Sequence, residues 1–264
     1  MQCNRAPESK PSARERELLK NYGRAWLGPL DSGIRKQGLV YRRGFPAEAR
    51  ECASEEQQAD PAWATVEALE LDVLTWGDRA VAFVERLDAL ERLFMRAEDA
   101  VLLRQVKPRL GVLGLRHVSA AELEVVLASP CFPALKQLDL DLGGKGFAAL
   151  SKHPGWKRVE RLRLTHWSIG ELPAFRGAVP ALEVVDRGGL SDDHNGWCLA
   201  FSGPRLERLH LRCTGQKPNT SWVQRALRTL PNQFLEVLTA DENVPLRGLE
   251  LSGELTRLRM RAAT

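Results

Sequence analysis

The sequence predicts an α/β solenoid, in which short strand-and-return units stack so that their strands form one curved parallel sheet. Three observations predict this fold. A phrase of three apolar residues, spaced as in Leu135, Leu138 and Leu140, recurs along most of the 264 residues. The first residues of successive phrases are 20 to 29 residues apart. Apolar residues also recur at helical spacing between some of the phrases. Since one such unit cannot bury its own apolar stripe, the units must stack.

The phrase and its period are the leucine-rich-repeat signature. Side chains alternate between the two faces of a strand, so the fourth and sixth positions enter one core. The third, fifth and seventh positions lie on the opposite, concave face. The further copies are Val66/Leu69/Leu71, Leu90/Leu93/Met95, Leu110/Leu113/Leu115, Val159/Leu162/Leu164, Leu182/Val185/Arg187, Leu206/Leu209/Leu211 and Leu235/Leu238/Ala240.

The chain outside the repeats predicts a cap at each end. Ser12 and Glu15 form a capping-box pattern before a helical run, and residues 39–45 read as a short strand with a turn after it. Near the C-terminus, Leu246 and Leu255 begin copies only nine residues apart, which suits capping strands. We therefore expect a disordered leader at 1–12, a helix-plus-strand cap at 13–62, about eight repeats at 63–243 and capping strands at 244–264.

The return segments between phrases differ in regularity. Helical periodicity is clear in Asp78–Leu87, Ser119–Ala128 and Ser221–Leu230, whereas 143–156 is looser and suits single helical turns. Arg187 replaces a core leucine before two glycines, which predicts a bulge in that repeat. Repeats of this kind usually place Asn at the ninth position. Here the ninth positions are Leu74, Glu98, Val118, Gly143, Trp167, Leu190, Thr214 and Asn243, so the usual asparagine ladder is absent.

Composition narrows the class of protein. The chain is 44% hydrophobic and 27% charged, as soluble globular proteins are. It has no apolar run of 18 residues and no apolar segment typical of a signal peptide. The 5 cysteines show no C-x-x-C spacing, which favours reduced thiols and excludes a zinc framework. We therefore expect a cytoplasmic protein that does not enter a membrane.

The net charge of +4 is unevenly distributed along the chain. Residues 1–50 carry 11 Lys and Arg against 5 Asp and Glu, so the repeats themselves are close to neutral. A basic stripe along the array, the usual footprint of a nucleic-acid-binding protein, is missing. We therefore expect no nucleic-acid partner.

The segment before the repeats carries a more specific resemblance. The runs Glu17-Leu18-Leu19 and Ala25–Leu30, followed by Tyr41–Phe45, resemble the segment that precedes the repeats in bacterial leucine-rich-repeat proteins of the repeat-companion-domain type. The resemblance extends from about residue 13 to the end and implies the same repeat architecture. In that family a small N-terminal companion domain commonly comes first, and we expect it to be missing here. The family shares no single biochemical role, so the resemblance implies no activity.

The predicted concave face carries charges of both signs. They can form a recognition surface for a partner, or they can pair with one another across strands and keep the sheet soluble. We favour recognition, because solenoids commonly bind through this extended surface. The candidate partner-binding residues are Arg92, Phe94, Arg96, Arg116, Asp139, Asp141, Arg161, Arg163, Asp186, Arg208, His210 and Arg212.

The sequence gives less support to a catalytic or metal-binding site than to a recognition surface. Asp186 on a strand between those of His166 and His210 could form a general base or a metal site, but solvated or hydrogen-bonded histidines are the commoner outcome. Residues 192–196 are rich in potential metal ligands, yet they are typical of a polar turn. Nucleophile-elbow, phosphate-loop and H-E-x-x-H motifs are absent from the sequence. We therefore expect no catalytic residue, no cofactor and no metal.

These observations predict non-catalytic protein–protein recognition, as a scaffold or adaptor, by a monomer that binds an unidentified protein. An alternative is an inhibitor or immunity-type protein that blocks a toxin or an enzyme. A second alternative, of a different class, is an enzyme that uses a concave cluster of Asp186, His210 and Arg163. That alternative requires the three side chains to converge in one pocket.

Overall fold

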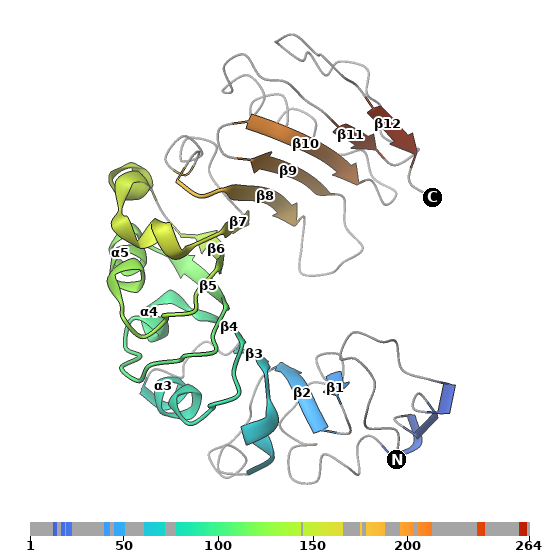
Figure 1. Cartoon of the computed structure of the whole chain (residues 1–264), viewed down its shortest axis with the longest axis vertical. Helices are drawn as coiled ribbons and strands as arrows, with labels where there is room; N and C mark the ends of the chain where they lie inside the picture. Colours follow the sequence, from blue (N-terminus) through green and yellow to red (C-terminus); the bar gives the residue numbers. More distant parts are fainter. Residues whose placement is uncertain are drawn as a thin grey trace. The chain divides into compact units, whose positions relative to one another are not determined.

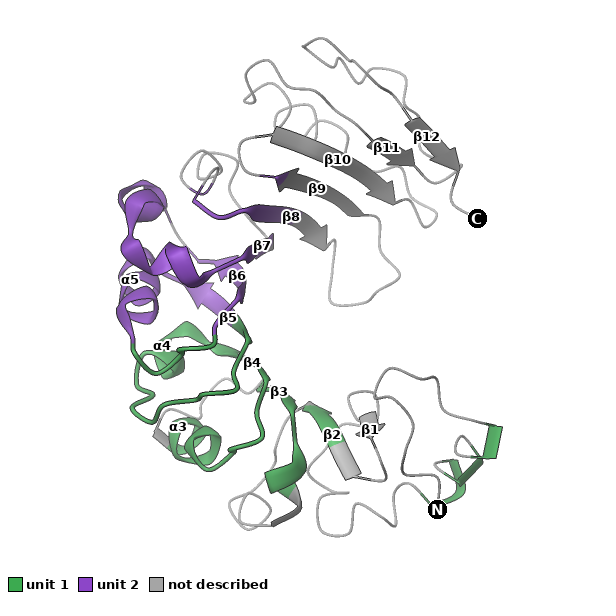
Figure 2. Cartoon of the chain, viewed as in Figure 1, with its two compact units in different colours: residues 1–114, 130–134 green, residues 115–129, 135–264 purple. Residues whose placement is uncertain are grey.

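The computed structural model divides into two compact units (Figures 1 and 2). Unit 1 comprises residues 1–114 and 130–134, and unit 2 comprises residues 115–129 and 135–264. The predicted boundaries at 12, 62 and 243 stay predictions. The structure describes residues 13–14, 17–18, 20–22, 40–42, 45–50, 61–71, 78–143, 145–165, 175, 178–187, 196–202, 205–212, 237–240 and 259–262.

Unit 1 is built on parallel strands with helical segments between them. A hairpin of two antiparallel strands leads into the parallel pairs β2–β3 and β3–β4. In register, Ala49, Leu69 and Leu93 lie side by side, and all three are buried. Its elements are β1 (Val40–Arg42), β2 (Phe45–Arg50), the 3-10 helix η3 (Pro61–Thr65), β3 (Ala68–Glu70), α3 (Asp78–Glu85), β4 (Arg92–Arg96) and α4 (Ala97–Ala100).

Helix α3 shows why the sequence folds locally as it does. Ala80, Phe83, Val84 and Leu87 follow helical spacing and are at most 2% exposed. The ring of Phe83 meets that of Trp63 edge to face, with centroids 5.0 Å apart and planes at 88°. The helix predicted at 78–87 is therefore confirmed, and its apolar face closes the core of unit 1.

Unit 2 repeats the arrangement and then departs from it. Strands β6, β7 and β8 are parallel, β9 is antiparallel to both of its neighbours, and β10, β11 and β12 are parallel again. Strand β5 runs from the last residues of unit 1 into unit 2. The elements are β5 (Val112–Val118), α5 (Ala120–Ala128), β6 (Gln137–Leu142), the 3-10 helices η4 (Phe147–Lys152) and η5 (Pro154–Arg158), β7 (Arg161–Thr165), β8 (Ala181–Arg187), β9 (Gly196–Ser202), β10 (Arg205–Arg212), β11 (Val237–Ala240) and β12 (Arg259–Ala262).

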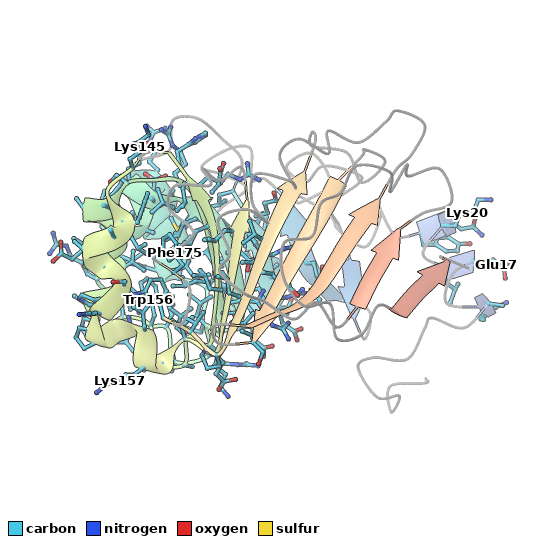
Figure 3. The ribbon with its side chains drawn as sticks, turned by 90° about the horizontal axis from the view of Figure 1, so that it is seen from above. Glu17, Lys20, Lys145, Trp156, Lys157 and Phe175 are labelled. Carbon is cyan, nitrogen blue, oxygen red and sulfur yellow. The ribbon has the colours of Figure 1, made fainter. Side chains whose placement is uncertain are left out.

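The leucines of the phrase form the core of unit 2. Leu138 pairs in register with Leu162, and Leu162 with Leu182; each is at most 1% exposed. Aromatic rings fill the space between these strands and the helical segments. Figure 3 shows Trp156 and Phe175 there, with ring centroids 6.0 Å apart. The α/β class is thus confirmed, and each of the eight predicted phrases between Val66 and Ala240 overlaps a strand.

Two returns follow the predicted pattern in unit 2. Helix α5 begins with a capping box in which Ser119 accepts from the backbone amide of Glu122 and the Glu122 carboxylate accepts from that of Ser119. The looser segment 143–156 forms the 3-10 helices η4 and η5, as its irregular spacing predicts. The helix predicted at 221–230 lies outside the described residues.

The missing asparagine ladder is replaced at one place by a direct backbone contact. The amide of Gly143 donates to the carbonyl of Val118 over 2.9 Å. A Cβ at Gly143 would lie 3.1 Å from the carbonyl carbon of His117, so glycine permits this close approach. His117 itself has a φ of 55°. The two ninth-position residues therefore connect without an amide side chain.

Three corrections concern strands. A second strand, β2, runs from Phe45 to Arg50, where a turn was expected after residue 45, and it buries Ala47 and Ala49. Strand β9 was not predicted, because residues 196–202 lie in what was taken for a return segment. An antiparallel strand between β8 and β10 also departs from a purely parallel array.

The third correction is the frame of the repeat that contains β8. The structure aligns Leu182 with Leu162 and Val184 with Leu164, so the predicted frame Leu182/Val185/Arg187 is wrong. Apolar residues occupy positions 182, 184 and 185, so the sequence allows either Val184 or Val185 to enter the core. The register with β7 places Leu182 and Val184 in line with the core residues Leu162 and Leu164. Glu183 therefore takes the fifth position that was assigned to Asp186.

Candidate recognition face

In each unit, the charged residues of the phrase lie on the strand face opposite the buried leucines. Burial alternates strictly along β4 and β6, with half-exposed residues at the third, fifth and seventh positions. Figures 1 and 2 show the helices α3 and α4 beside β3 and β4 in unit 1, and the helix α5 beside β5 and β6 in unit 2. We call the half-exposed positions the strand face of that unit.

The strand face of unit 1 is largely neutralised by its own residues. Arg92 on β4 forms an ion pair with Glu48 on β2, although β3 lies between these strands. The register places Ala68 between the two charges, and its small side chain leaves them room to meet. Next along β4, Arg96 pairs with Glu98 over 2.9 Å.

The aromatic residue of this face is also engaged within the fold. Phe94 covers Gly114: a Cβ at Gly114 would lie 2.0 Å from the ring carbon Cδ1 of Phe94. Glycine is therefore required at 114 for the ring to lie flat on the neighbouring backbone. Of the predicted binding residues, Arg92, Phe94 and Arg96 thus have structural partners in unit 1.

The strand face of unit 2 has a different charge pattern. Asp139, Arg163 and Glu183 lie side by side in register on β6, β7 and β8, so the charge alternates across the three strands. The amide of Gln137 donates to the Asp139 carboxylate over 2.9 Å. Arg161 lies two residues before Arg163 on the same face of β7, and it is exposed.

Several charges of this face have no partner within the described part of the chain. No hydrogen bond or ion pair to a described residue is formed by Arg161, Arg163, Asp141 or Glu183. The Nε atom of Arg163 is buried without a hydrogen-bond acceptor among those residues. Pairing across strands, the alternative to recognition, therefore accounts for the charges of unit 1 and not for these four.

The remaining predicted residues are placed only in part. Arg116 lies on β5 within unit 2, half-exposed. For Asp186 on β8 and for Arg208, His210 and Arg212 on β10, the structure describes the backbone and not the side chains. Sequence reasoning missed Glu183. The signal that could have found it was the spacing of the apolar residues 179, 182 and 184, which the structure buries.

The predicted cluster of Asp186, His210 and Arg163 is not supported by the strand order. Strand β9 lies between β8 and β10, so Asp186 and His210 are not on neighbouring strands. The register pairs Asp186 with Trp197, and it pairs His210 with the next residue, Cys198. Successive residues of a strand lie on opposite faces, so Asp186 and His210 belong to opposite faces of the sheet. His166 and residues 192–195 lie outside the described residues.

Two cations that sequence reasoning missed, buried Lys107 and half-buried Arg158, hold helix ends in place. Lys107, 2% exposed, donates through Nζ to the backbone carbonyls of Glu85, the last residue of α3, and of Leu87, two residues later. Arg158 donates to three carbonyls at the end of α5. Cations suit the partial negative charge of a helix C-terminus. Their carbonyl partners indicate structural roles, away from the strand face.

The electrostatics of these groups follow from their surroundings. Burial lowers the pKa of Lys107, and the nearby carboxylates of Asp88 and Glu85 offset part of that effect. Burial also lowers the pKa of Arg158. Hydrogen bonds from the backbone amides of Arg104 and Gln105 lower the pKa of Glu85. Each of these shifts belongs to the packing of helix ends.

Neither the metal-ligating residues nor comparisons with known proteins assign a function to the described part of the chain. Within the described ranges, no three His, Cys, Asp or Glu residues gather closely enough to hold a metal ion. A search of the same residues finds no helix with the length and apolar character needed to span a membrane. Comparisons with protein-family models, curated proteins and solved structures found no match.

Proposed function

We propose that this protein is a leucine-rich-repeat solenoid that recognises another protein, without catalysis, through the strand face of unit 2. The observation that carries the proposal is a set of partly exposed charges on β6, β7 and β8 that have no partner among the residues that the structure describes. Arg161, Arg163, Asp141 and Glu183 present both signs of charge on the strand face, opposite the buried leucines. Such a pattern suits a partner surface of complementary charge.

Unit 1 supplies the internal comparison. Its strand face has the same alternation of buried and half-exposed residues, but Arg92 and Arg96 are paired with carboxylates of the same unit. A charge satisfied in the fold has less to gain from a partner, because binding must first break the existing pair. We therefore place the main contact on unit 2, and we propose a cytoplasmic monomer as its bearer.

The experiment is a purification of the tagged protein from cells of its natural source, with quantitative mass spectrometry of what is retained. Arg161→Glu reverses one exposed charge on the strand face; the residues directly opposite in register are Gln137 and Ala181, so no directly opposed like-charge pair is created. The matched control is Lys157→Glu, which makes the same charge change at an exposed residue on the helical side (Figure 3).

We expect a protein that is retained by the wild type and by Lys157→Glu, and that is depleted about tenfold by Arg161→Glu, which corresponds to about 1.4 kcal/mol. Circular dichroism and thermal unfolding must show that both variants are folded. Equal retention by all three proteins would place recognition away from the strand face of unit 2.

A further inference from the structure

Strand β9 brings a cysteine and a histidine together by its register. Cys198 is the Cα partner of His210 on β10 and of Val185 on β8. Directly opposite residues of an antiparallel pair have Cβ atoms roughly 4.5–5.5 Å apart. Figure 1 shows β9 between β8 and β10, running in the opposite direction. The insertion that breaks the parallel array thus places a thiol-bearing residue beside an imidazole-bearing one.

The positions diagonal to Cys198 are mostly cationic. On β8 they are Glu183 and Arg187, and on β10 they are Arg208 and Arg212. Residues in these positions lie roughly 7–8 Å away, within reach of long side chains. Val185 lies directly opposite on β8, so the ionisable residues at the register positions around Cys198 are three arginines, one histidine and one glutamate.

The same register assigns this group to the strand face of unit 2. Glu183, which is half-exposed, is the Cα partner of Ala200, and Cys198 is two residues from Ala200 along β9. Positions two residues apart share a face of a strand. The group therefore occupies the face that carries Arg163 and Glu183, opposite the buried Leu182 and Val184.

We propose that Cys198 is a nucleophilic cysteine, activated by His210, and that it is a site of covalent modification by small anionic electrophiles. Reactive cysteines lie in partly exposed, electropositive surroundings next to His, Lys or Arg, which favour the thiolate. His210 accepts the thiol proton, and Arg187, Arg208 and Arg212 attract an anionic reagent. This assignment is independent of the proposed recognition of a protein.

The test uses alkylation of the folded full-length protein with iodoacetamide and, separately, with iodoacetate. The Cys198 thiolate attacks the methylene carbon, a carbon–sulfur bond forms, the carbon–iodine bond breaks, and iodide leaves. Mass spectrometry of the tryptic peptide 188–205, in which Cys198 is the sole cysteine, follows the reaction. Buried Cys131 and the same peptide in urea-denatured protein serve as references.

At pH 7 we expect Cys198 to react with iodoacetamide about tenfold faster than the denatured reference, because an ordinary thiol of pKa about 8.5 is only about 3% ionised there. The midpoint of its rate against pH should lie below that of the reference. The ratio of the iodoacetate rate to the iodoacetamide rate should be higher at Cys198 in the folded protein than at the same cysteine in the denatured peptide. His210→Gln should lower the iodoacetamide rate at least threefold, and Arg212→Gln should mainly lower the preference for iodoacetate.

Circular dichroism and the protection of Cys131 confirm that each variant is folded. A Cys198 that reacts no faster than the denatured reference, with an ordinary midpoint, would overturn the proposal. A folded His210→Gln variant with the wild-type rate and pH profile would overturn the role of His210.

Discussion

Arg158 offers the sharpest test of how unit 2 is held together. Its Nη1 donates to the carbonyl of Ser129 over 3.0 Å, and its Nη2 donates to those of Val126 and Leu127 over 2.9 and 3.0 Å. One side chain of η5 therefore satisfies three carbonyls at the end of α5, about one repeat earlier in the chain. Gly155 makes this approach possible, because a Cβ there would lie 2.4 Å from the carbonyl oxygen of Leu127.

The expected cost of Arg158→Met follows from these contacts. A hydrogen bond with one charged partner contributes about 1.5–3 kcal/mol, and an unpaired buried carbonyl carries a similar penalty. The three bonds share one cation, so their contributions do not add. The guanidinium is also only partly buried, and its desolvation opposes the gain. We expect the free energy of unfolding to fall by about 3 kcal/mol.

The assay is equilibrium unfolding in urea, followed by far-ultraviolet circular dichroism, with amide hydrogen exchange of residues 123–160. Arg158→Lys should recover less than half of the loss, since an ammonium group cannot match the planar fork of the guanidinium. Lys157→Met, at an exposed neighbour on the same helix, should change stability by at most about 0.5 kcal/mol. An Arg158→Met variant as stable as Lys157→Met, with unchanged exchange, would refute the reasoning.

Three further predictions concern unit 1. Gly114→Ala should displace the ring of Phe94 and lower stability by about 1–3 kcal/mol, which urea unfolding measures; an unchanged midpoint would show that the ring is not held against the backbone. Glu85→Gln should destabilise the protein at neutral pH. The folded-state pKa of Glu85 is lowered, so its contribution is present above the ordinary value of 4.5 and lost as pH falls through the lowered pKa. Unfolding curves from pH 3 to 7 should therefore converge at the acidic end, and a constant difference would contradict this. Lys107→Met should cost about 2–4 kcal/mol, because the carbonyls of Glu85 and Leu87 lose their shared donor; thermal unfolding at the wild-type temperature would contradict it.

The sequence predicts the strand faces well because their signal is local. A period of two within a strand decides which residues are buried, and α3 and α5 follow from apolar spacing in the same way. Strand β9 had a local signal too: Trp197, Leu199 and Phe201 alternate with Cys198 and Ala200. That alternation was outweighed by the regular spacing of the phrases on either side, which made the segment resemble a return.

The pairing of charges could not be predicted, because it depends on register between strands that are distant in sequence. Whether Arg92 meets Glu48 depends on Ala68 occupying the strand between them. The carbonyl partners of Arg158 likewise lie about 30 residues away. The same limit applies to Arg163: its place on the strand face follows from the alternation within β7, but whether a described residue accepts from its Nε depends on the neighbouring strands.

Arg163 also carries a final prediction, which separates a structural from a recognition role. Arg163 is half-buried, and its Nε is buried without a hydrogen-bond acceptor among the described residues. A charge held in this way contributes little to folding, and replacing it can even be favourable. Arg163→Gln should therefore change the free energy of unfolding in urea by less than about 1 kcal/mol, with either sign. The same variant should lose the protein retained by the wild type. A loss of more than about 2 kcal/mol would identify Arg163 as part of the fold, since stability and binding would then fall together. Only the combination of unchanged stability and lost binding fits a residue that is kept for its partner.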